Sequence, residues 1–450
     1  MKLFFYSLAL AACVLPTLAN AANQHVRPGA AGRNDGSDWA NAYTKLPTSL
    51  NRGDTYYLAN GSYGNYVFAA ANSGAVAITV KKAVEADHGT ATGWSSSYGD
   101  GQAVFTNWQI YTDYYVFDGQ RRNGDWTSGT TSQYGIKVAG TSPVRLDNGS
   151  GTGGDNLTFR YVDFQGGGRD TGAGDDVIYG LAGNTNLTFQ YCALHDSDRT
   201  IFLMRGNWQN LTVDHSYLAR NTSSPASHGE MLSMTESTNV TWSNNVMEDI
   251  EGTAFIAGLN GGTASNWKIF GNVAFHSAAY IADSGRKSGH NFGVAGLVYV
   301  ANDSSNNNQG NNFLVYNNTM VNIQGTYSGV VIQSGTGNEV RNNAWYASVR
   351  TNNSFNGTIS HNWYYNTVQD GDSTTTKTVC TSGCDIFTSI GGKDFHLKAP
   401  TAAGTVLTAP YNADMNGAIR GADGNWDRGA FEFGSSNTPA LPVPSNLKVQ

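Results

Sequence analysis

Eight segments of the chain share one local pattern, in which an Asn or a Gly begins a short β-rich stretch. The first residues of these segments are Asn156, Asn186, Asn210, Asn239, Asn266, Asn312, Gly337 and Asn356. Five of the seven steps between them measure 24 to 30 residues, and the step of 46 residues fits two coils around an extra strand at 296–301. Self-similarity at such a period is typical of solenoids, in which each repeat packs against its neighbours.

Each repeat also contains a second short strand upstream of the first, as in Val177–Gly180, Thr200–Met204 and Ala254–Ala257. Strand-forming Val, Ile, Thr, Phe and Tyr dominate these stretches, and no helical period of 3.6 residues lies between them. Successive coils are therefore expected to stack strand on strand in parallel register. The sequence predicts an all-β fold, a single-stranded parallel β-helix.

Pairs of asparagines recur at one position of the coil, as Asn244–Asn245, Asn317–Asn318 and Asn342–Asn343. At the strand spacing of ~4.8 Å, their amides are expected to bond from one coil to the next.

The positions that lie an even number of residues upstream of the repeat asparagines are occupied by apolar residues. We expect three of these to point inward and stack across coils, namely Ile178, Phe202 and Met231.

Residues 1–21 have the form of a secretory signal peptide, with an apolar run and a small-residue cleavage site that ends at Ala21. A lipoprotein box at Cys13 is a competing interpretation, but the apolar residues directly after it argue against lipid anchoring. The mature protein is therefore expected outside the cell or in the periplasm. In that oxidising compartment Cys380 and Cys384 can close a small disulfide loop.

The charge balance excludes several kinds of partner. The chain has 27 Lys and Arg against 34 Asp and Glu, a net charge of −7, without a long basic run, so nucleic acid is not an expected partner. Beyond the signal peptide no stretch approaches the ~20 apolar residues of a membrane span. We expect a monomer, in which residues 22–433 form one β-helix domain and residues 434–450 a linker or a truncated tail.

Ionisable side chains are scarce, at 14% of the residues, but they converge upstream of three repeat asparagines. Five of them lie at odd distances from those asparagines: Asp175, Arg199, Arg205, His228 and Glu230. If the strands stay extended there, the five side chains share one outward face, because side chains alternate with a period of two. Asp176 and Asp198 occupy neighbouring positions. This cluster is the predicted functional site.

Two terminal patterns carry a resemblance to a known group of proteins. Residues 52–63 and 77–83 look like the opening coil of chondroitinase-B-like and alginate-lyase-like helices, and residues 410–417 with 426–433 look like their closing segment. Over about residues 50 to 433 the chain resembles the secreted right-handed parallel β-helix proteins, a group dominated by polysaccharide lyases. The resemblance implies a right-handed helix that acts on an anionic polysaccharide.

The segment Glu230–Ser237 also resembles the acidic strand of the chondroitinase-B-like family, although the family's lysine falls on Thr235 here. A lyase of this kind removes a proton next to a uronate carboxylate, which requires a positioned base and a cation. Within the predicted cluster, we expect His228 to act as the base and Arg199 or Arg205 to pair with the uronate. We also expect carboxylates of Asp175, Asp176, Asp198 and Glu230 to supply ligands for a Ca²⁺ ion.

Three further cations are candidates for binding the polymer: Lys268, Arg286 and Lys287. Two other functions fit the same residues. A glycoside hydrolase would use an acid and base pair drawn from Asp175, Asp176 and Asp198. A glycan-binding adhesin would use the solenoid face without catalysis.

Overall fold

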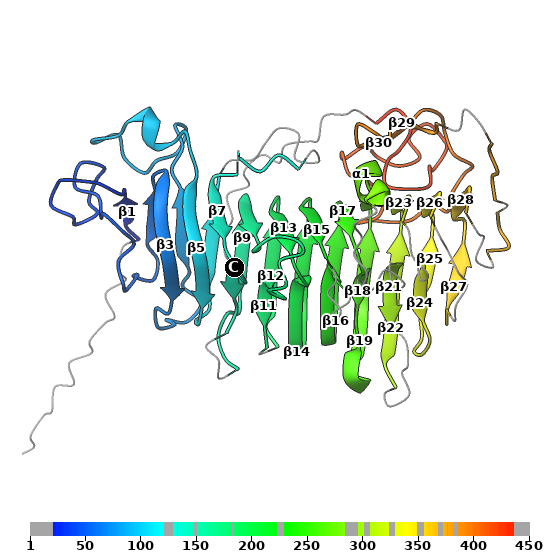
Figure 1. The fold of residues 1–450 in the computed structure, drawn as a ribbon, viewed down its shortest axis with the longest axis horizontal. Helices are drawn as coiled ribbons and strands as arrows, with labels where there is room; N and C mark the ends of the chain where they lie inside the picture. The colour runs from blue at the N-terminus through cyan, green and yellow to red at the C-terminus, as the bar shows by residue number, and fades with distance from the viewer. Residues whose placement is uncertain are drawn as a thin grey trace, which may run out of the picture.

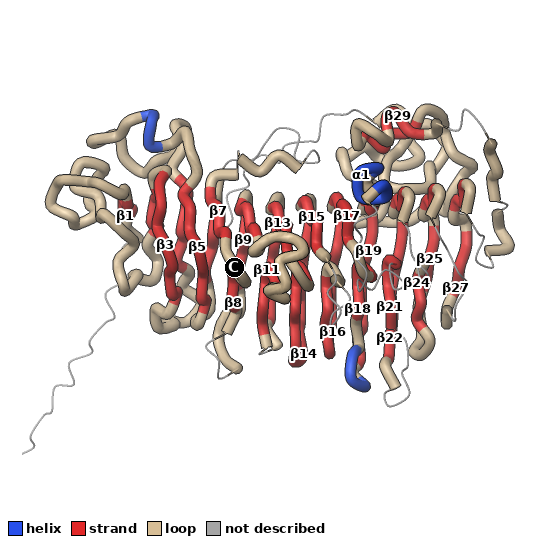
Figure 2. The backbone as a smooth tube through the Cα atoms, viewed as in Figure 1, coloured by secondary structure: helices blue, strands red, loops and turns tan. Residues whose placement is uncertain are grey.

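The computed structural model describes residues 21–435 except 121–128, 133, 148–150, 182, 223–228, 284–295, 301–306, 324–328, 349–354, 368–371, 376 and 382–384. Its strands stack into one elongated body (Figure 1), and strands and loops account for nearly all of the backbone (Figure 2). Within these residues, 28 strands form one continuous hydrogen-bonded sheet. No described helix is both long enough and apolar enough to cross a membrane.

Each coil contributes up to three strands, so the strands stack in three columns. Column 1 contains β1 (Asn23–Val26), β2 (Thr55–Leu58), β4 (Ile78–Lys82), β6 (Tyr115–Asp118), β9 (Leu157–Arg160), β12 (Thr185–Gln190), the second parts of β14 (Thr200–Asp214) and β16 (Leu232–Ser243), β19 (Thr263–Phe270), β22 (Gln309–Tyr316), β25 (Glu339–Arg341) and β27 (Thr358–Ser360). Because β14 and β16 run through a corner of the coil, their first parts belong to column 3.

Columns 2 and 3 continue the coil from column 1. Column 2 contains β3 (Gly61–Phe68), β5 (Ala103–Ile110), β7 (Ile136–Ala139), β10 (Val162–Gln165), β13 (Ala193–Ser197), β15 (Tyr217–Asn221), β17 (Val246–Ile250), β20 (Val273–Phe275), β23 (Thr319–Val321), β26 (Ala344–Tyr346) and β28 (Trp363–Tyr365). Column 3 contains the ends of β3 and β5, then β8 (Val144–Arg145), β11 (Asp176–Gly180), the first parts of β14 and β16, β18 (Thr253–Ile256), β21 (Gly296–Val300) and β24 (Val330–Ile332).

All pairings within the columns are parallel, as in β12 with β14, where Leu187 faces Leu211. The predicted all-β, right-handed parallel β-helix is confirmed. Outside the columns, the described residues include the antiparallel pair β29 (Phe387–Ser389) and β30 (Asp394–Leu397), the helix α1 (Ala278–Ala282) and the 3-10 turns Ser96–Tyr98 and Leu259–Gly261.

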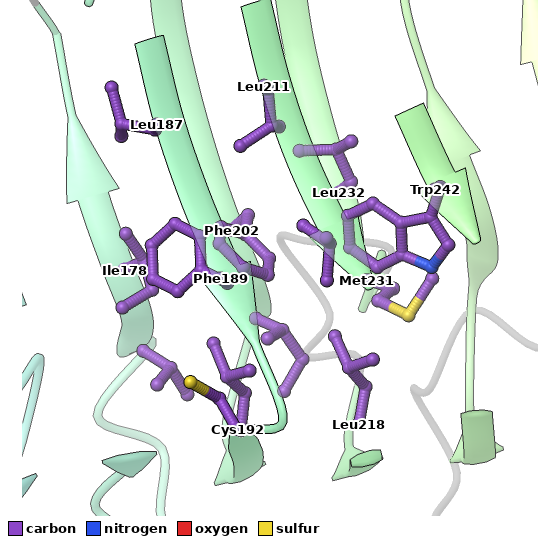
Figure 3. Close-up of a cluster of buried hydrophobic side chains, with 14 of the residues drawn as sticks. Ile178, Leu187, Phe189, Cys192, Phe202, Leu211, Leu218, Met231, Leu232 and Trp242 are labelled. Atoms are coloured by element: carbon purple, nitrogen blue, oxygen red, sulfur yellow. The ribbon is translucent and has the colours of Figure 1, made fainter. Parts of the chain in front are cut away.

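The apolar residues of the repeat fill the inside of the coil. Phe189 stacks on Phe159 of the preceding coil with ring centroids 4.6 Å apart. The three residues predicted to point inward, Ile178, Phe202 and Met231, are fully buried in this core (Figure 3). Ile178 pairs with Phe202 as expected.

The predicted stacking of Met231 on Phe202 is wrong by one residue, because Phe202 pairs with Leu232 instead. Between this pair and the repeat asparagines, β14 contains one residue more than β16. Residues at equal distances from the repeat asparagines therefore do not lie opposite one another.

The predicted asparagine ladder is present for the second member of each pair. Asn245, Asn272, Asn318, Asn343 and Asn362 are buried, and each Nδ2 donates to the acceptor oxygen on the next coil at 2.9 to 3.2 Å. Each of these Nδ2 groups also donates to a backbone carbonyl at 2.8 or 2.9 Å. Both Nδ2 donors of each amide are therefore satisfied inside the core, where an unsatisfied amide would cost ~1 to 3 kcal/mol.

Two of the first members, Asn317 and Asn342, have another role, because they anchor the segment that closes the helix. Asn342 Oδ1 accepts from the backbone N–H of Thr405, and its Nδ2 donates to the carbonyl of the same residue, both at 2.8 Å. The Trp426 indole donates to Asn317 Oδ1 at 3.3 Å. These contacts, together with apolar packing on columns 1 and 2, fix the closing segment 400–433 along one side of the solenoid.

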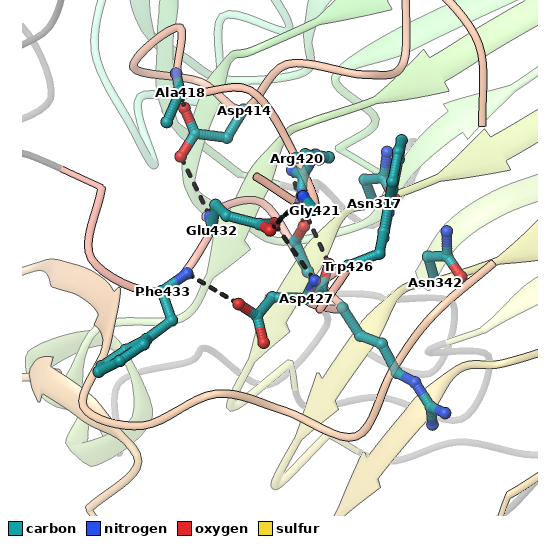
Figure 4. A network of polar contacts seen from close by, with 12 residues as sticks. Asn317, Asn342, Asp414, Ala418, Arg420, Gly421, Trp426, Asp427, Glu432 and Phe433 are labelled. Atoms are coloured by element: carbon teal, nitrogen blue, oxygen red, sulfur yellow. Dashed lines mark hydrogen bonds and ion pairs between the residues drawn. The ribbon is translucent and has the colours of Figure 1, made fainter. Parts of the chain in front are cut away.

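A buried polar network holds the closing segment together (Figure 4). Arg420 is fully buried and donates to the carbonyls of Gly429 and Ala430 at 2.9 and 2.8 Å. Glu432 lies 3.6 Å from this guanidinium, and burial raises the pKa of Glu432 to about 6. The carboxylate of Asp414 accepts the backbone N–H of Glu432 at 3.1 Å.

The structure tests the cysteine predictions only in part. Cys192 is a free thiol buried in the core. Cys380 is disulfide-bonded, while Cys384, its predicted partner, lies outside the described residues.

Replacing Phe202 by Ala should lower the free energy of unfolding by ~3 to 5 kcal/mol, because the cavity cannot be filled by the rigid neighbouring coils. Urea denaturation monitored by circular dichroism measures this. Phe433→Ala is the matched control, since 38% of Phe433 is exposed and its loss should cost little. A cost below ~1 kcal/mol for Phe202→Ala would contradict the packing.

Candidate functional site

The predicted site residues lie where column 2 turns into column 3 and along the start of column 3. Asp175 directly precedes β11, while Asp198 and Glu230 stand just before β14 and β16. Arg205 lies within β14, directly after the residues that pair in column 3. Three predicted residues lie outside the described part of the chain: His228, Arg286 and Lys287.

The expectation of an outward acidic column is wrong. Four residues assigned to it are buried, with at most 5% of their surface exposed: Asp175, Asp176, Asp198 and Glu230. Asp175 accepts the backbone N–H groups of Asp198 and Gly167 at 2.8 and 2.7 Å. Asp175 and Asp198 stand before their strands, in turns, where the two-residue alternation of a strand does not apply. They brace the corner of the coil.

Asp176 is held by an ion pair with Arg199 of the next coil. Arg199 Nε donates to Asp176 Oδ1 at 2.9 Å, Nη2 contacts Oδ2, and the Thr200 hydroxyl also donates to Oδ1. The hydrogen bond to Asp176 raises the pKa of the Arg199 guanidinium. The Asp176 side chain is 2% exposed and that of Arg199 35%, so the pair is open to solvent on the arginine side only.

Arg205 differs from Arg199, because it forms no ion pair with any described carboxylate. Its Nη1 donates to the carbonyl and the hydroxyl oxygen of Ser233 at 3.0 and 3.2 Å. Burial lowers the pKa of the Arg205 guanidinium, although the charges of Glu230 and Asp176 act against that shift. The remaining guanidinium donors of this half-buried side chain are available to an anion from outside.

A β-bulge places Arg205 at this position. Met204 pairs with Met234 and Asn207 with Glu236, so Arg205 and Gly206 stand opposite one residue of β16. Gly206 has φ of 87°, a conformation that costs glycine little. A bulge re-aims the side chains of its strand, and this one also causes the register slip between β14 and β16.

Two residues on earlier coils extend this surface. Tyr179 pairs with Arg145 on β8 and with Leu203 on β14. The Arg145 guanidinium lies 5.6 Å from the centre of the Tyr179 ring and binds Asp147 at 2.9 Å. We call the surface formed by Arg145, Tyr179, Arg199 and Arg205 the arginine face. It offers cationic groups and one aromatic ring on three adjacent coils.

The four predicted calcium ligands do not form one ligand set. Among the described residues, no group of three or more His, Cys, Asp or Glu side chains is arranged to hold a metal ion. Asp176 is committed to Arg199 and Thr200, while Asp198 accepts the backbone N–H of Gly174 at 3.0 Å. Calcium dependence stays a prediction of the sequence.

A second polar cluster, on the outer side of column 2, was not predicted. His195, whose sequence context suggests the cap of a turn, lies within β13 with Nε2 2.7 Å from Asp163 and Nδ1 2.6 Å from Asp196. Burial alone would lower the pKa of His195, but hydrogen bonds to both carboxylates outweigh it and raise the pKa. Arg220 binds Asp196 at 2.6 Å from the following coil.

The same cluster continues to the turn between β29 and β30. The Tyr217 hydroxyl donates to Glu248 Oε2 at 2.6 Å, and Lys393 binds the same oxygen at 2.8 Å. Burial raises the pKa of Tyr217, and the charge of Glu248 adds to this effect. Because Tyr217 is fully buried and the charges are paired, this cluster fastens the coils and the β29–β30 pair to one another. One feature of the sequence could have revealed this cluster: His195 and Glu248 each stand nine residues after the repeat asparagine of their coil.

Lys268 lies apart from the arginine face, on the outer side of column 1. It pairs with Thr241 of β16 and Leu314 of β22, is exposed, and forms no ion pair or hydrogen bond with the described residues. The predicted site and this predicted binding residue therefore occupy different columns.

Comparison with known proteins identifies the architecture. No protein-family model and no curated protein matches the chain. Among solved structures, the chain is similar to pectate lyase Pel9A, with a TM-score of 0.52, 14% sequence identity, and coverage of 93% of this chain and 98% of that one. A weaker similarity is to the tailspike protein of E. coli bacteriophage HK620, with a TM-score of 0.29, 12% identity, and coverage of 81% and 59%. At this identity the first similarity establishes the parallel β-helix fold.

The contacts predict unequal effects of two arginine substitutions on stability. Arg199→Ala leaves buried Asp176 without its cation and should lower the free energy of unfolding by about 2 to 4 kcal/mol. Arg205→Ala loses only the hydrogen bonds to Ser233 and a longer one, of 3.4 Å, to the carbonyl of Met204, and should cost about 1 kcal/mol or less. Urea denaturation of both variants measures the difference. An equal, large cost for Arg205→Ala would show that Arg205 is a structural residue.

Proposed function

We propose that this protein is a secreted lyase that cleaves an anionic, uronate-containing polysaccharide by β-elimination at the arginine face. The observation that carries the proposal is Arg205, a half-buried guanidinium without an ion-pair partner among the described residues. A partly desolvated cation favours a counter-ion, and an arginine binds a carboxylate through two parallel hydrogen bonds. A uronate carboxylate has the geometry and the charge for this position.

The β-elimination needs a cation beside the uronate carboxylate, and this is the role of Arg205 in the proposal. A base removes the proton on the carbon next to the carboxylate, and those electrons form the new carbon–carbon double bond. The bond to the 4-linked oxygen breaks, and the leaving oxygen takes up a proton. Negative charge develops on the carboxylate during proton removal, so a cation fixed beside it lowers the barrier. Arg199 adds positive potential, while its pair with Asp176 holds it in place.

The base in this proposal is His228, which the sequence predicts and which lies outside the described residues. Neutral imidazole is suited to proton removal near neutral pH. The similarity in fold to a protein named as a pectate lyase supports a polysaccharide as the substrate. Alginate, pectate and glycosaminoglycans all supply the required uronate.

The hydrolase alternative gains no support from the aspartates. Every carboxylate oxygen of Asp175, Asp176 and Asp198 accepts a hydrogen bond from the protein. All three residues are at most 2% exposed. A general acid and base pair needs carboxyl groups that reach the substrate.

Ultraviolet absorbance of unsaturated uronate products, measured over alginate, polygalacturonate and glycosaminoglycans, tests the proposal. Arg205→Ala and His228→Ala should each lower turnover by at least ~100-fold, because each removes a group that acts in the transition state. Their melting temperatures should stay near that of the wild type. Assays with a chelator test the predicted calcium dependence.

Arg33→Ala is the matched control, since Arg33 is exposed in the N-terminal loops and its ion pair is with Asp35, also at the surface. It should retain wild-type turnover. Wild-type protein that yields no unsaturated product from any of these polymers, or full activity in Arg205→Ala, would contradict the proposal.

A further inference from the structure

The outer side of column 1 presents a regular array of polar groups. At the register position occupied by Lys268, the four preceding coils carry threonines: Thr158, Thr188, Thr212 and Thr241. Their hydroxyl groups form no hydrogen bond with the described residues. Four donors and acceptors, repeated at the strand spacing of ~4.8 Å, therefore face solvent beside an unpaired lysine.

A second array runs parallel to the first, two residues upstream on each strand. It consists of the repeat asparagines, all with positive φ: Asn156, Asn186, Asn210, Asn239, Asn266 and Asn312. From Asn186 onward, each Nδ2 donates to Oδ1 of the asparagine on the preceding coil at 2.8 to 3.1 Å. Each amide has two N–H groups and two lone pairs. Within the array, each asparagine uses one N–H group and one lone pair in the ladder. One N–H group and one lone pair of its amide therefore remain for other partners.

The two arrays meet at a hollow of about 350 Å³. It is lined by Asn239, Thr241, Asn266, Lys268, Asn312 and Leu314. Lys268 supplies a positive charge without a partner among the described residues, and Leu314 supplies an apolar patch. Amide and hydroxyl donors, one cation and an apolar surface are the groups that bind an acidic sugar.

We infer that this hollow is a second glycan-binding site, which holds an acidic polysaccharide chain along the helix axis, away from the arginine face. The coil repeat is close to the length of one sugar unit, so successive threonines and asparagines meet successive sugar hydroxyl groups. Lys268 pairs with a carboxylate or sulfate of the chain. The inference takes its ligand class from the proposed function but does not require cleavage.

The site is a binding site without chemistry of its own. Among its six lining residues, Lys268 is the single ionisable group, so the hollow lacks an acid and base pair. Its effect on a polymer is therefore retention, by raising the local concentration of the chain near the arginine face.

The test measures polymer affinity in the Arg205→Ala background, in which the expected loss of turnover limits cleavage during the titration. Isothermal titration calorimetry with alginate, polygalacturonate and chondroitin sulfate gives the Kd. Lys268→Glu should raise the Kd for the bound polymer about 10-fold or more, because an attraction becomes a repulsion. Thr241→Val should raise it about 5-fold, the equivalent of one hydrogen bond.

Lys45→Glu is the matched control, because Lys45 is also exposed and makes the same charge change in the N-terminal region. Its Kd should remain within about 2-fold of the background. Equal Kd values for Lys268→Glu and Lys45→Glu, or absence of binding to all three polymers, would overturn the inference. So would sedimentation showing that this side of column 1 pairs with a second copy of the chain. Failure of the proposed lyase would appear separately, as absence of unsaturated product from the wild type.

Discussion

Coil-to-coil hydrogen bonding is the constraint on which the rest of this structure depends. A single coil leaves one edge of each of its strands unpaired, and only the next coil in parallel register satisfies it. The buried ladder from Asn245 to Asn362 adds a side-chain connection at each coil that it crosses, with both Nδ2 donors of each amide satisfied. A shift of one residue would break these bonds and turn the core residues outward. The ladder therefore fixes the register of the C-terminal half.

Because the register is strict, one additional residue in a strand must be accommodated locally, as a bulge. Between β14 and β16 the chain has one additional residue, at Arg205 and Gly206, and the stack absorbs it as a bulge. Arg205 consequently departs from the alternation of its strand and lies partly buried beside Ser233. The regular scaffold thus supplies rigidity, and the bulge supplies the cation on which the proposed function rests. Rigid strands hold such groups more accurately than loops do.

The sequence predicted the features that follow from periodicity. The repeat of the asparagines indicated stacked coils, the even positions placed Ile178 and Phe202 in the core, and the Asn pairs predicted a ladder. It failed where the period does not apply. Asp175 and Asp198 lie in turns, so parity could not place them. The bond between Lys393 and Glu248 joins residues 145 positions apart, a contact without any local signal.

Our main proposal is that the arginine face binds the uronate that is cleaved. A crystal structure of the His228→Ala variant with a uronate oligosaccharide is its decisive test, because the substrate should remain intact. We expect one uronate carboxylate within hydrogen-bonding distance of the Arg205 guanidinium, with the chain crossing β11, β14 and β16. The proposal would be contradicted if the oligosaccharide bound only away from the arginine face, or if Arg205 were paired with a carboxylate of the protein.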